Sequence, residues 1–224
     1  MLSGSKENAV HATRALCAAL PEDGSLFKQI VRKLTASSAS ALSLKNKRLH
    51  LVFFVLSVLA EQRPAALADG VVDRVMSFAL DKILLDDIGA YSGDGSEGKS
   101  RGQTHEAVLR CAAIRLITAL FMSQYGAKVE ATDVDRFMDF LFGLLNNRGI
   151  LDEDIAENTP SQDRIELHAA AAKTLLRLST NSKYDAKITV ERWHAMASVF
   201  ASDQKPSVRM EALNTLEKLG RRGT

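Results

Sequence analysis

Residues 188–219 read ITVERWHAMASVFASDQKPSVRMEALNTLEKL, and this stretch predicts two antiparallel helices joined by a short corner. Thr189 is a candidate N-cap, because its hydroxyl can accept a hydrogen bond from an orphan amide of the first turn. Apolar residues at spacings of three and four then form one helical face: Val190, Trp193, Met196, Ala197, Val199 and Phe200. Asp203 stands in the corner, and Pro206 opens the second helix, where proline is tolerated.

The second helix of this pair carries a pattern with fixed spacing. Val208 is followed directly by Arg209, after four residues by Ala212 and after eight by Leu216. With Asp203 in the corner, the pattern resembles a HEAT repeat. The small Ala lets two helices approach closely, while the Asp and the Arg can bond across the corner or to the corner of the next repeat. The resemblance implies an all-α fold, an α-solenoid of stacked antiparallel helix pairs.

The same spacing recurs upstream, which favours a repeat array over a single hairpin. The closer copies are Leu167 with Ala171 and Leu175, and Val108 with Ala112 and Leu116; the looser copies are Leu49 with Phe53 and Ser57, and Asn8 with Ala12 and Leu16. Successive anchors lie 41, 59, 59 and 41 residues apart. Since HEAT repeats recur about every 40 residues, the two long intervals each indicate an insertion. We expect one array over residues 1–224, with mobile insertions at about 88–103 and 147–162.

The bulk composition is that of a globular protein. Of 224 residues, 46% are hydrophobic and 25% are charged, which excludes disorder throughout the chain. The net charge of +2 does not demand a polyanionic partner. The two cysteines, Cys17 and Cys111, are expected as buried reduced thiols of an intracellular protein.

No membrane or export segment is expected. The N-terminal residues lack the apolar run of a signal peptide. The most apolar stretch, residues 49–60, is about twelve residues long, whereas a membrane span needs about twenty. This stretch is therefore predicted to be a buried core helix, ended by Arg63-Pro64 because the residue before proline is disfavoured in a helix.

The apolar periodicity predicts further helices along the chain. They cover residues 5–20, with Ser5 as cap and one stripe of Ala9, Ala12, Leu16 and Ala19; 26–35, burying Phe27, Ile30, Val31 and Leu34; 71–85; 106–125, capped by Thr104; and 132–146, burying Val134, Phe137, Met138, Leu141, Phe142 and Leu145. No stretch favours a strand.

Catalytic and metal-binding motifs are missing from the sequence. It holds no P-loop, no G-x-S-x-G, no H-E-x-x-H and no cysteine pair at metal spacing. The glycines of residues 93–96 resemble a phosphate loop only in composition, and the acidic residues at 86–87 and 152–154 lack the spacing of a calcium loop. We therefore expect a protein that is not an enzyme and uses no cofactor, metal or small-molecule substrate.

A basic cluster leaves a nucleic-acid interface open as an alternative. It comprises Lys28, Arg32, Lys33, Lys45, Lys47 and Arg48. These side chains would form one ridge if the two helices that carry them lay side by side. No aromatic residue interleaves with them, and acidic residues elsewhere cancel the total charge, so an ordinary solvated face is favoured over a contact with DNA.

One run resembles a particular family. The run consists, in order, of residues 163–170 (DRIELHAA), 175–179, Tyr184, 188–189, 191–193 and 208–209. This run is similar to one in the cohesin-associated "precocious dissociation of sisters" cohesion factors, and residues 7–11, 78–87 and 107–120 extend the similarity upstream. The chain departs from the family pattern at Val190, where the family has Pro, at Trp193, where it has Phe or Tyr, and in its glycine-rich stretch after Gly89. Because the family protein is much longer, this chain would be a central slice of it.

The resemblance implies a nuclear, chromatin-associated scaffold without enzymatic activity. Such proteins bind the kleisin subunit of the cohesin ring and other cohesin regulators, and so control sister-chromatid cohesion. Lys6, His11 and Arg14 are candidates for kleisin contact, because an Ala-Val-His sequence near them matches the family; the alternative is that His11 packs against the adjacent helix. A HEAT adaptor or transport-type scaffold with another cargo remains a further alternative.

Overall fold

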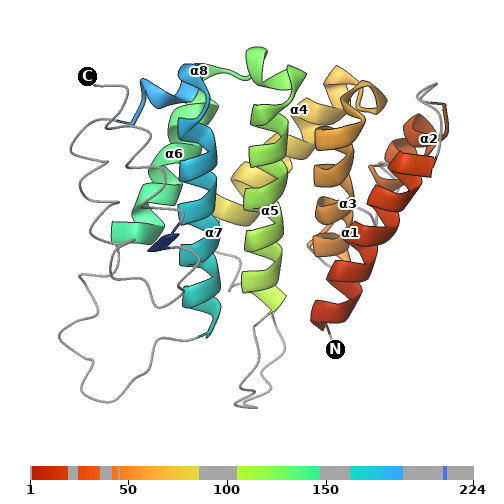
Figure 1. The fold of residues 1–224 in the computed structure, drawn as a ribbon, viewed down its shortest axis with the longest axis horizontal. Helices are drawn as coiled ribbons and strands as arrows, with labels where there is room; N and C mark the ends of the chain where they lie inside the picture. The colour runs from red at the N-terminus through yellow and green to blue at the C-terminus, as the bar shows by residue number, and fades with distance from the viewer. Residues whose placement is uncertain are drawn as a thin grey trace. The chain divides into compact units, whose positions relative to one another are not determined.

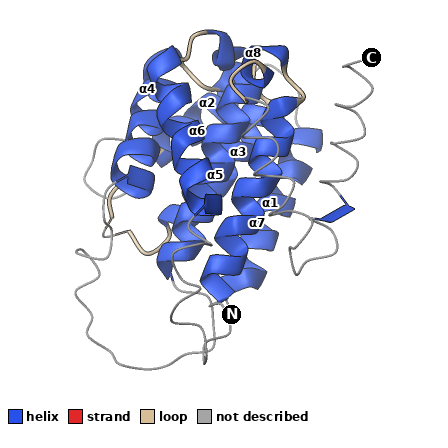
Figure 2. Cartoon of the chain, turned by 90° about the vertical axis from the view of Figure 1, so that its left-hand side faces the viewer, coloured by secondary structure: helices blue, strands red, loops and turns tan. Residues whose placement is uncertain are grey.

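The computed structural model describes residues 2–19, 25–35, 42–44, 46–85, 105–146, 162–188 and 209–210. Within these ranges every regular element is a helix and no strand is present, so the predicted all-α class is confirmed (Figures 1 and 2). The chain divides into two compact units, Met1–Val129 and Glu130–Thr224.

The first unit contains five α-helices and three other helical segments in its described part. The α-helices are α1 (Leu2–Ala19), α2 (Ser25–Leu34), α3 (Leu49–Gln62), α4 (Asp69–Ser77) and α5 (His105–Met122). The 3-10 helices η1 (Pro64–Ala66) and η4 (Gln124–Ala127) follow α3 and α5, and the π-helix η2 (Phe78–Leu85) continues α4.

Helix α3 forms the core of the first unit. It contacts α1 on one side and α5 on the other (Figure 1). Because its side chains are apolar almost all round, ten of its fourteen residues are buried. The predicted buried core helix is thus confirmed, and it ends at Arg63-Pro64, as expected from the proline.

Small side chains let α5 pack closely on this core. Ala112 and Ala113 have no exposed surface, and Leu116 is equally enclosed. The copy of the repeat spacing anchored at Val108 therefore lies on a buried face, as the pattern predicts. The helix is shorter than expected, since the chain passes into a 3-10 turn soon after Met122.

Helix α1 turns a different face to the core than the one predicted. The helix runs through Ser5, so the prediction that this residue caps it is wrong. The predicted stripe of Ala9, Ala12, Leu16 and Ala19 mostly faces solvent: Ala12 and Ala19 are exposed, and Leu16 is 46% exposed.

The buried face of α1 is made by Val10, Thr13 and Cys17, at spacings of three and four. This face lies against α3. Thr13 can be buried because its hydroxyl donates a hydrogen bond of 2.7 Å to the carbonyl oxygen of Ala9. The repeat copy anchored at Asn8 is consequently not a buried ridge.

The single helix predicted over residues 71–85 is two elements. Helix α4 ends at Ser77, and the chain continues as the π-helix η2, which lies against α5. Its buried residues are Ala79, Leu80, Ile83 and Leu84. The i→i+5 pattern of a π-helix widens the turn, and residues four apart then share the face toward α5.

The second unit contains α6 (Ala131–Asn146), α7 (Gln162–Ser179) and α8 (Ser182–Asp185) in its described part. Helices α6 and α7 pack on each other, and α7 also contacts α8. All six apolar residues predicted for the core face of α6 are buried: Val134, Phe137, Met138, Leu141, Phe142 and Leu145. Asn181 caps α8, because its side-chain oxygen accepts a hydrogen bond of 3.0 Å from the amide of Lys183.

Several predictions fall outside the described residues. These are the cap Thr104, the insertion over residues 88–103, nearly all of the insertion over residues 147–162, whose last residue begins α7, the corner residue Asp203, and the helix residues Val208 and Ala212. Arg209 is described and is half-buried. None of the described helices is both long enough and apolar enough to cross a membrane.

Candidate partner-binding surfaces

The outward side of α1 carries two of the three residues singled out for kleisin contact. His11 and Arg14 are both exposed, and at a spacing of three they are neighbours on the helix surface. The side chain of Lys6 lies outside the described part. The exposure of His11 disfavours the alternative that it packs against the adjacent helix.

The side chains around His11 on the surface of α1 are mostly small and apolar. Ala12, Ala15, Leu16 and Ala19 are exposed beside it, and we call these five residues the α1 outer face. Since an alanine projects only one carbon beyond the backbone, a second chain can approach this helix closely. A partner that binds this face would meet small side chains beside the imidazole of His11 and the guanidinium of Arg14.

Arg63 holds the C-terminal end of α1 in place. Its guanidinium donates a hydrogen bond to the carbonyl oxygen of Cys17, and its Cζ lies 5.9 Å from the centre of the Phe27 ring. A cation at the C-terminus of a helix is favourable, because the last carbonyls carry partial negative charge. Arg63 is the first residue after α3, so this one side chain connects α1, α2 and α3.

Burial changes the acidity of the thiol beneath this contact. Desolvation raises the pKa of Cys17 above its ordinary value, and the positive charge of Arg63 opposes the shift only in part. Cys17 is buried and Cys111 is half-buried, and both are free thiols. This agrees with the predicted reduced cysteines, although Cys111 is less enclosed than expected.

The basic cluster is exposed wherever the structure describes it. Lys28, Arg32 and Lys33 lie on α2, while Lys47 and Arg48 lie just before α3. Lys45 is outside the described residues. Helices α2 and α3 touch, but this contact does not establish that the two groups of cations form one surface, so the ridge stays a prediction.

The chain end of α2 is held against α4. Arg74 donates a hydrogen bond of 3.0 Å to the carbonyl oxygen of Thr35, and the hydroxyl of Thr35 donates one of 2.8 Å to the carbonyl oxygen of Val31. Phe27 and Val31, one turn apart, are each 2% exposed. These contacts determine which side of α2 faces the core and leave its cations on the other side.

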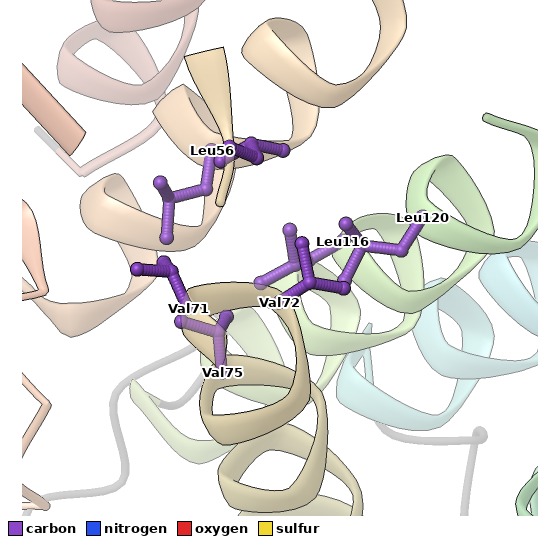
Figure 3. Close-up of a pocket in the computed structure, with 7 residues that line it drawn as sticks. Leu56, Val71, Val72, Val75, Leu116 and Leu120 are labelled. Carbon is purple, nitrogen blue, oxygen red and sulfur yellow. The ribbon is translucent and has the colours of Figure 1, made fainter. Parts of the chain in front are cut away.

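A small apolar cavity lies between α3, α4 and α5 (Figure 3). Its lining is entirely hydrophobic: Leu56, Leu67, Val71, Val72, Val75, Leu116 and Leu120. Its volume is about 10 Å³. A water molecule needs two to four polar partners, which this lining does not offer, so the cavity is a packing gap and not a site for chemistry.

Histidines also meet at one place in the first unit. The rings of His50 and His105 are 5.6 Å apart and edge to face, and Nε2 of His105 lies 2.9 Å from the carbonyl oxygen of Lys47. Zinc sites in proteins take three or four protein ligands. Among the residues that the structure describes, no group of three or more His, Cys, Asp or Glu side chains could hold a metal ion.

Sequence analysis did not predict two sets of hydrogen bonds that connect helices of the first unit. The hydroxyl of Tyr125 approaches the carbonyl oxygens of Leu67 and of Pro64, the latter at 2.9 Å, and so joins η4 to the link between α3 and α4. Nε of Arg115 donates a hydrogen bond of 3.1 Å to Oγ of Ser57, between α5 and α3. No motif marks these residues, because their partners are about 60 residues away in the chain.

Comparison with known proteins gives one match. The model of a family described as "Sister chromatid cohesion protein PDS5 protein" matches residues 1–223. No curated protein and no solved structure matches the chain.

Proposed function

Because the chain belongs to the PDS5 family of sister chromatid cohesion proteins, we propose that it is a non-enzymatic scaffold that binds the kleisin subunit of cohesin. By this binding it controls sister-chromatid cohesion on chromatin, in the nucleus. The observation that carries the proposal is the family match over residues 1–223. A HEAT adaptor or transport-type scaffold with an unrelated cargo is disfavoured by the same match.

The arrangement of helices supports a scaffold built by stacking. Helix α3 is covered on two sides, by α1, which contributes one face to the core, and by α5, which is buried on most of its surface. We propose that this arrangement continues as HEAT repeats, with Asp203 and Arg209 linking adjacent corners. A stack of this kind exposes a long ridged surface on which an extended peptide can lie.

We place the kleisin contact on the α1 outer face, together with Lys6 and Arg14. His11 is exposed there, and the alanines beside it allow a peptide or helix to approach the α1 backbone. A partner with an acidic group could pair with Arg14. The contact is placed on α1 because this helix carries the Ala-Val-His sequence that matches the family.

Titration of the chain with a labelled N-terminal segment of the kleisin from its own organism tests this proposal. The His11→Glu variant is expected to bind about tenfold more weakly, equivalent to about 1.4 kcal/mol. Gln29→Glu is the matched control, because Gln29 is exposed on the neighbouring helix α2 and the change in charge is similar.

The outcomes separate the family role from the location of the contact. Binding that both variants retain would place the kleisin contact elsewhere on the chain. A folded wild-type chain that binds no kleisin segment would contradict the scaffold function as proposed.

A further inference from the structure

The outward side of α2 is a strongly positive surface. With 3.6 residues per turn, the buried Phe27 and Val31 define the inner side of the helix. Lys28 and Arg32 are one turn apart on one flank of the outer side, and Lys33 lies on its other flank. We call these three exposed residues the α2 cations.

No acidic residue neutralises this surface along the chain. Residues 24–60 contain six Lys and Arg and not one Asp or Glu. Within the described part of the chain, ion pairs are made by other cations, such as Arg110 with Glu106 at 3.0 Å, and none involves the α2 cations. An overall charge of +2 therefore conceals a local excess of positive charge.

We propose that the α2 cations bind the phosphate backbone of duplex DNA, with Lys47 and Arg48 extending the contact. Exposed lysines and arginines without carboxylate partners are what phosphate binding needs, because affinity comes from released counterions. The α2 cations share no residue with the α1 outer face, so the inference does not depend on kleisin binding.

The same stretch argues against single-stranded nucleic acid. Single strands are held by stacking of bases on exposed aromatic side chains. The aromatic residues of residues 24–60 are Phe27, Phe53 and Phe54, and all three are buried. The surface can therefore contact phosphates but cannot stack bases, which also predicts binding without sequence preference.

An acidic peptide is the competing partner, and the surroundings favour it less. Peptide recognition relies on a few apolar anchors seated in pockets. Leu26, at 44% exposure, is the large apolar side chain exposed on α2, and the cavity between α3, α4 and α5 has a volume of only about 10 Å³. Neither offers an anchor site beside the cations.

The test is fluorescence anisotropy of two labelled 30-base-pair duplexes of unrelated sequence, titrated with the full chain at increasing salt. The three α2 cations alone predict that affinity falls about 40-fold between about 50 and 200 mM salt, and contacts from Lys47 and Arg48 would make the fall steeper. The triple variant Lys28→Glu, Arg32→Glu, Lys33→Glu is expected to bind at least about tenfold more weakly at low salt, with a flatter salt dependence.

The control is Lys128→Glu, Lys173→Glu, Lys183→Glu, which changes three other exposed lysines and lowers the net charge equally. Circular dichroism verifies that both variants are folded. The control should keep affinity within about threefold of the wild type. Equal weakening in both variants would overturn the proposal, because it would show a general charge effect.

A second arm distinguishes the two classes of polyanion. Unlabelled duplex should displace the labelled duplex at a lower concentration of negative charge than a 20-residue poly-glutamate does. Displacement by poly-glutamate at an equal or lower concentration of charge would overturn the DNA assignment and favour an acidic protein segment as the partner of α2.

Discussion

Arg63 is the residue on which three helices of the first unit converge. It donates to the carbonyl oxygen of Cys17, covers the ring of Phe27 and follows the end of α3. We expect Arg63→Ala to lower the free energy of unfolding by about 2 kcal/mol, because a charged hydrogen bond is lost. Urea denaturation followed by circular dichroism measures this change.

Two further variants separate charge from geometry at this position. Arg63→Lys keeps the charge but loses the planar guanidinium, so its stability should lie between those of the wild type and Arg63→Ala. Lys173→Ala, on an exposed position of α7, should change stability by less than about 0.5 kcal/mol. A loss as large in Lys173→Ala would contradict the assigned role of Arg63.

The buried thiol of Cys17 makes stability depend on pH in the alkaline range. Its pKa is raised above the ordinary value of 9.0 in the folded chain, so between the two values the folded state holds a proton that the unfolded state has lost. The free energy of unfolding should therefore be unaffected below about pH 9 and should fall as the pH rises through the folded pKa.

Burial also raises the pKa of Tyr184 above its ordinary value of 10.0, which adds a second decline at higher pH. Thermal melts at pH 8, 9 and 10 of the wild type and of Cys17→Ala isolate the effect of the thiol, because the decline from Tyr184 begins only near pH 10. The variant should be less stable throughout and should lose less stability between pH 9 and 10 than the wild type does. Parallel pH profiles would show that the thiol is not the titrating group.

Among the elements, the junction of α3, α4 and α5 leaves a small apolar gap in the packing of the first unit. Leu116 lines the apolar cavity there and has no exposed surface. We expect Leu116→Ala to cost about 3 kcal/mol, because it enlarges a cavity that water does not fill. Val72→Ile adds one methylene toward the gap and should change stability by less than about 1.5 kcal/mol in either direction. Chemical denaturation of both variants, with unchanged helix content, measures the difference.

The predictability of these elements depended on how sharply each sequence separates polar from apolar residues. Helix α6 alternates its six buried residues with Asp133, Asp135, Arg136 and Asp139, so one face is unambiguous. Helix α1 carries most of its alanines outside the face that is buried, so they suggested a stripe that was wrong. The face made by Val10, Thr13 and Cys17 is buried in the core of the first unit. Which face of α1 is buried depends on its packing against α3 and not on the sequence of α1 alone.

The π-helix η2 was missed for a different reason. A spacing of three and four residues suits an α-helix, while pairs four apart also suit the wider turn of a π-helix. Ala79 with Ile83 and Leu80 with Leu84 satisfy both patterns. Periodicity is thus consistent with the residues that are buried but cannot tell the two helix types apart.

At the scale of the whole molecule, the division into two units predicts independent folding. The residues 1–129 include α3 together with its neighbours α1 and α5, and so contain a complete core. Expressed alone, this fragment should be helical and unfold cooperatively in urea, with a smaller m-value than the full chain because it exposes less surface. A fragment that becomes helical only when residues 130–224 are added would contradict this expectation.

Sequence also predicts more about the family than about the binding surfaces of the molecule. The resemblance carried by residues 163–170 and 208–209 agrees with the family match over residues 1–223. His11 was singled out through the same resemblance, and only the structure shows that this residue is exposed. Which surface of a scaffold meets its partner depends on the partner's shape, and that information is not contained in one chain.

The enclosure of α3 has a consequence for how the first unit exchanges its amide hydrogens with solvent. Local fraying releases terminal helices at little cost, but a helix covered on two sides opens only when its covers leave. The amides of Leu49–Gln62 should therefore be the last of this unit to take up deuterium, and their uptake rate should track the global free energy of unfolding. Deuterium in α3 then marks molecules in which the entire first unit has opened.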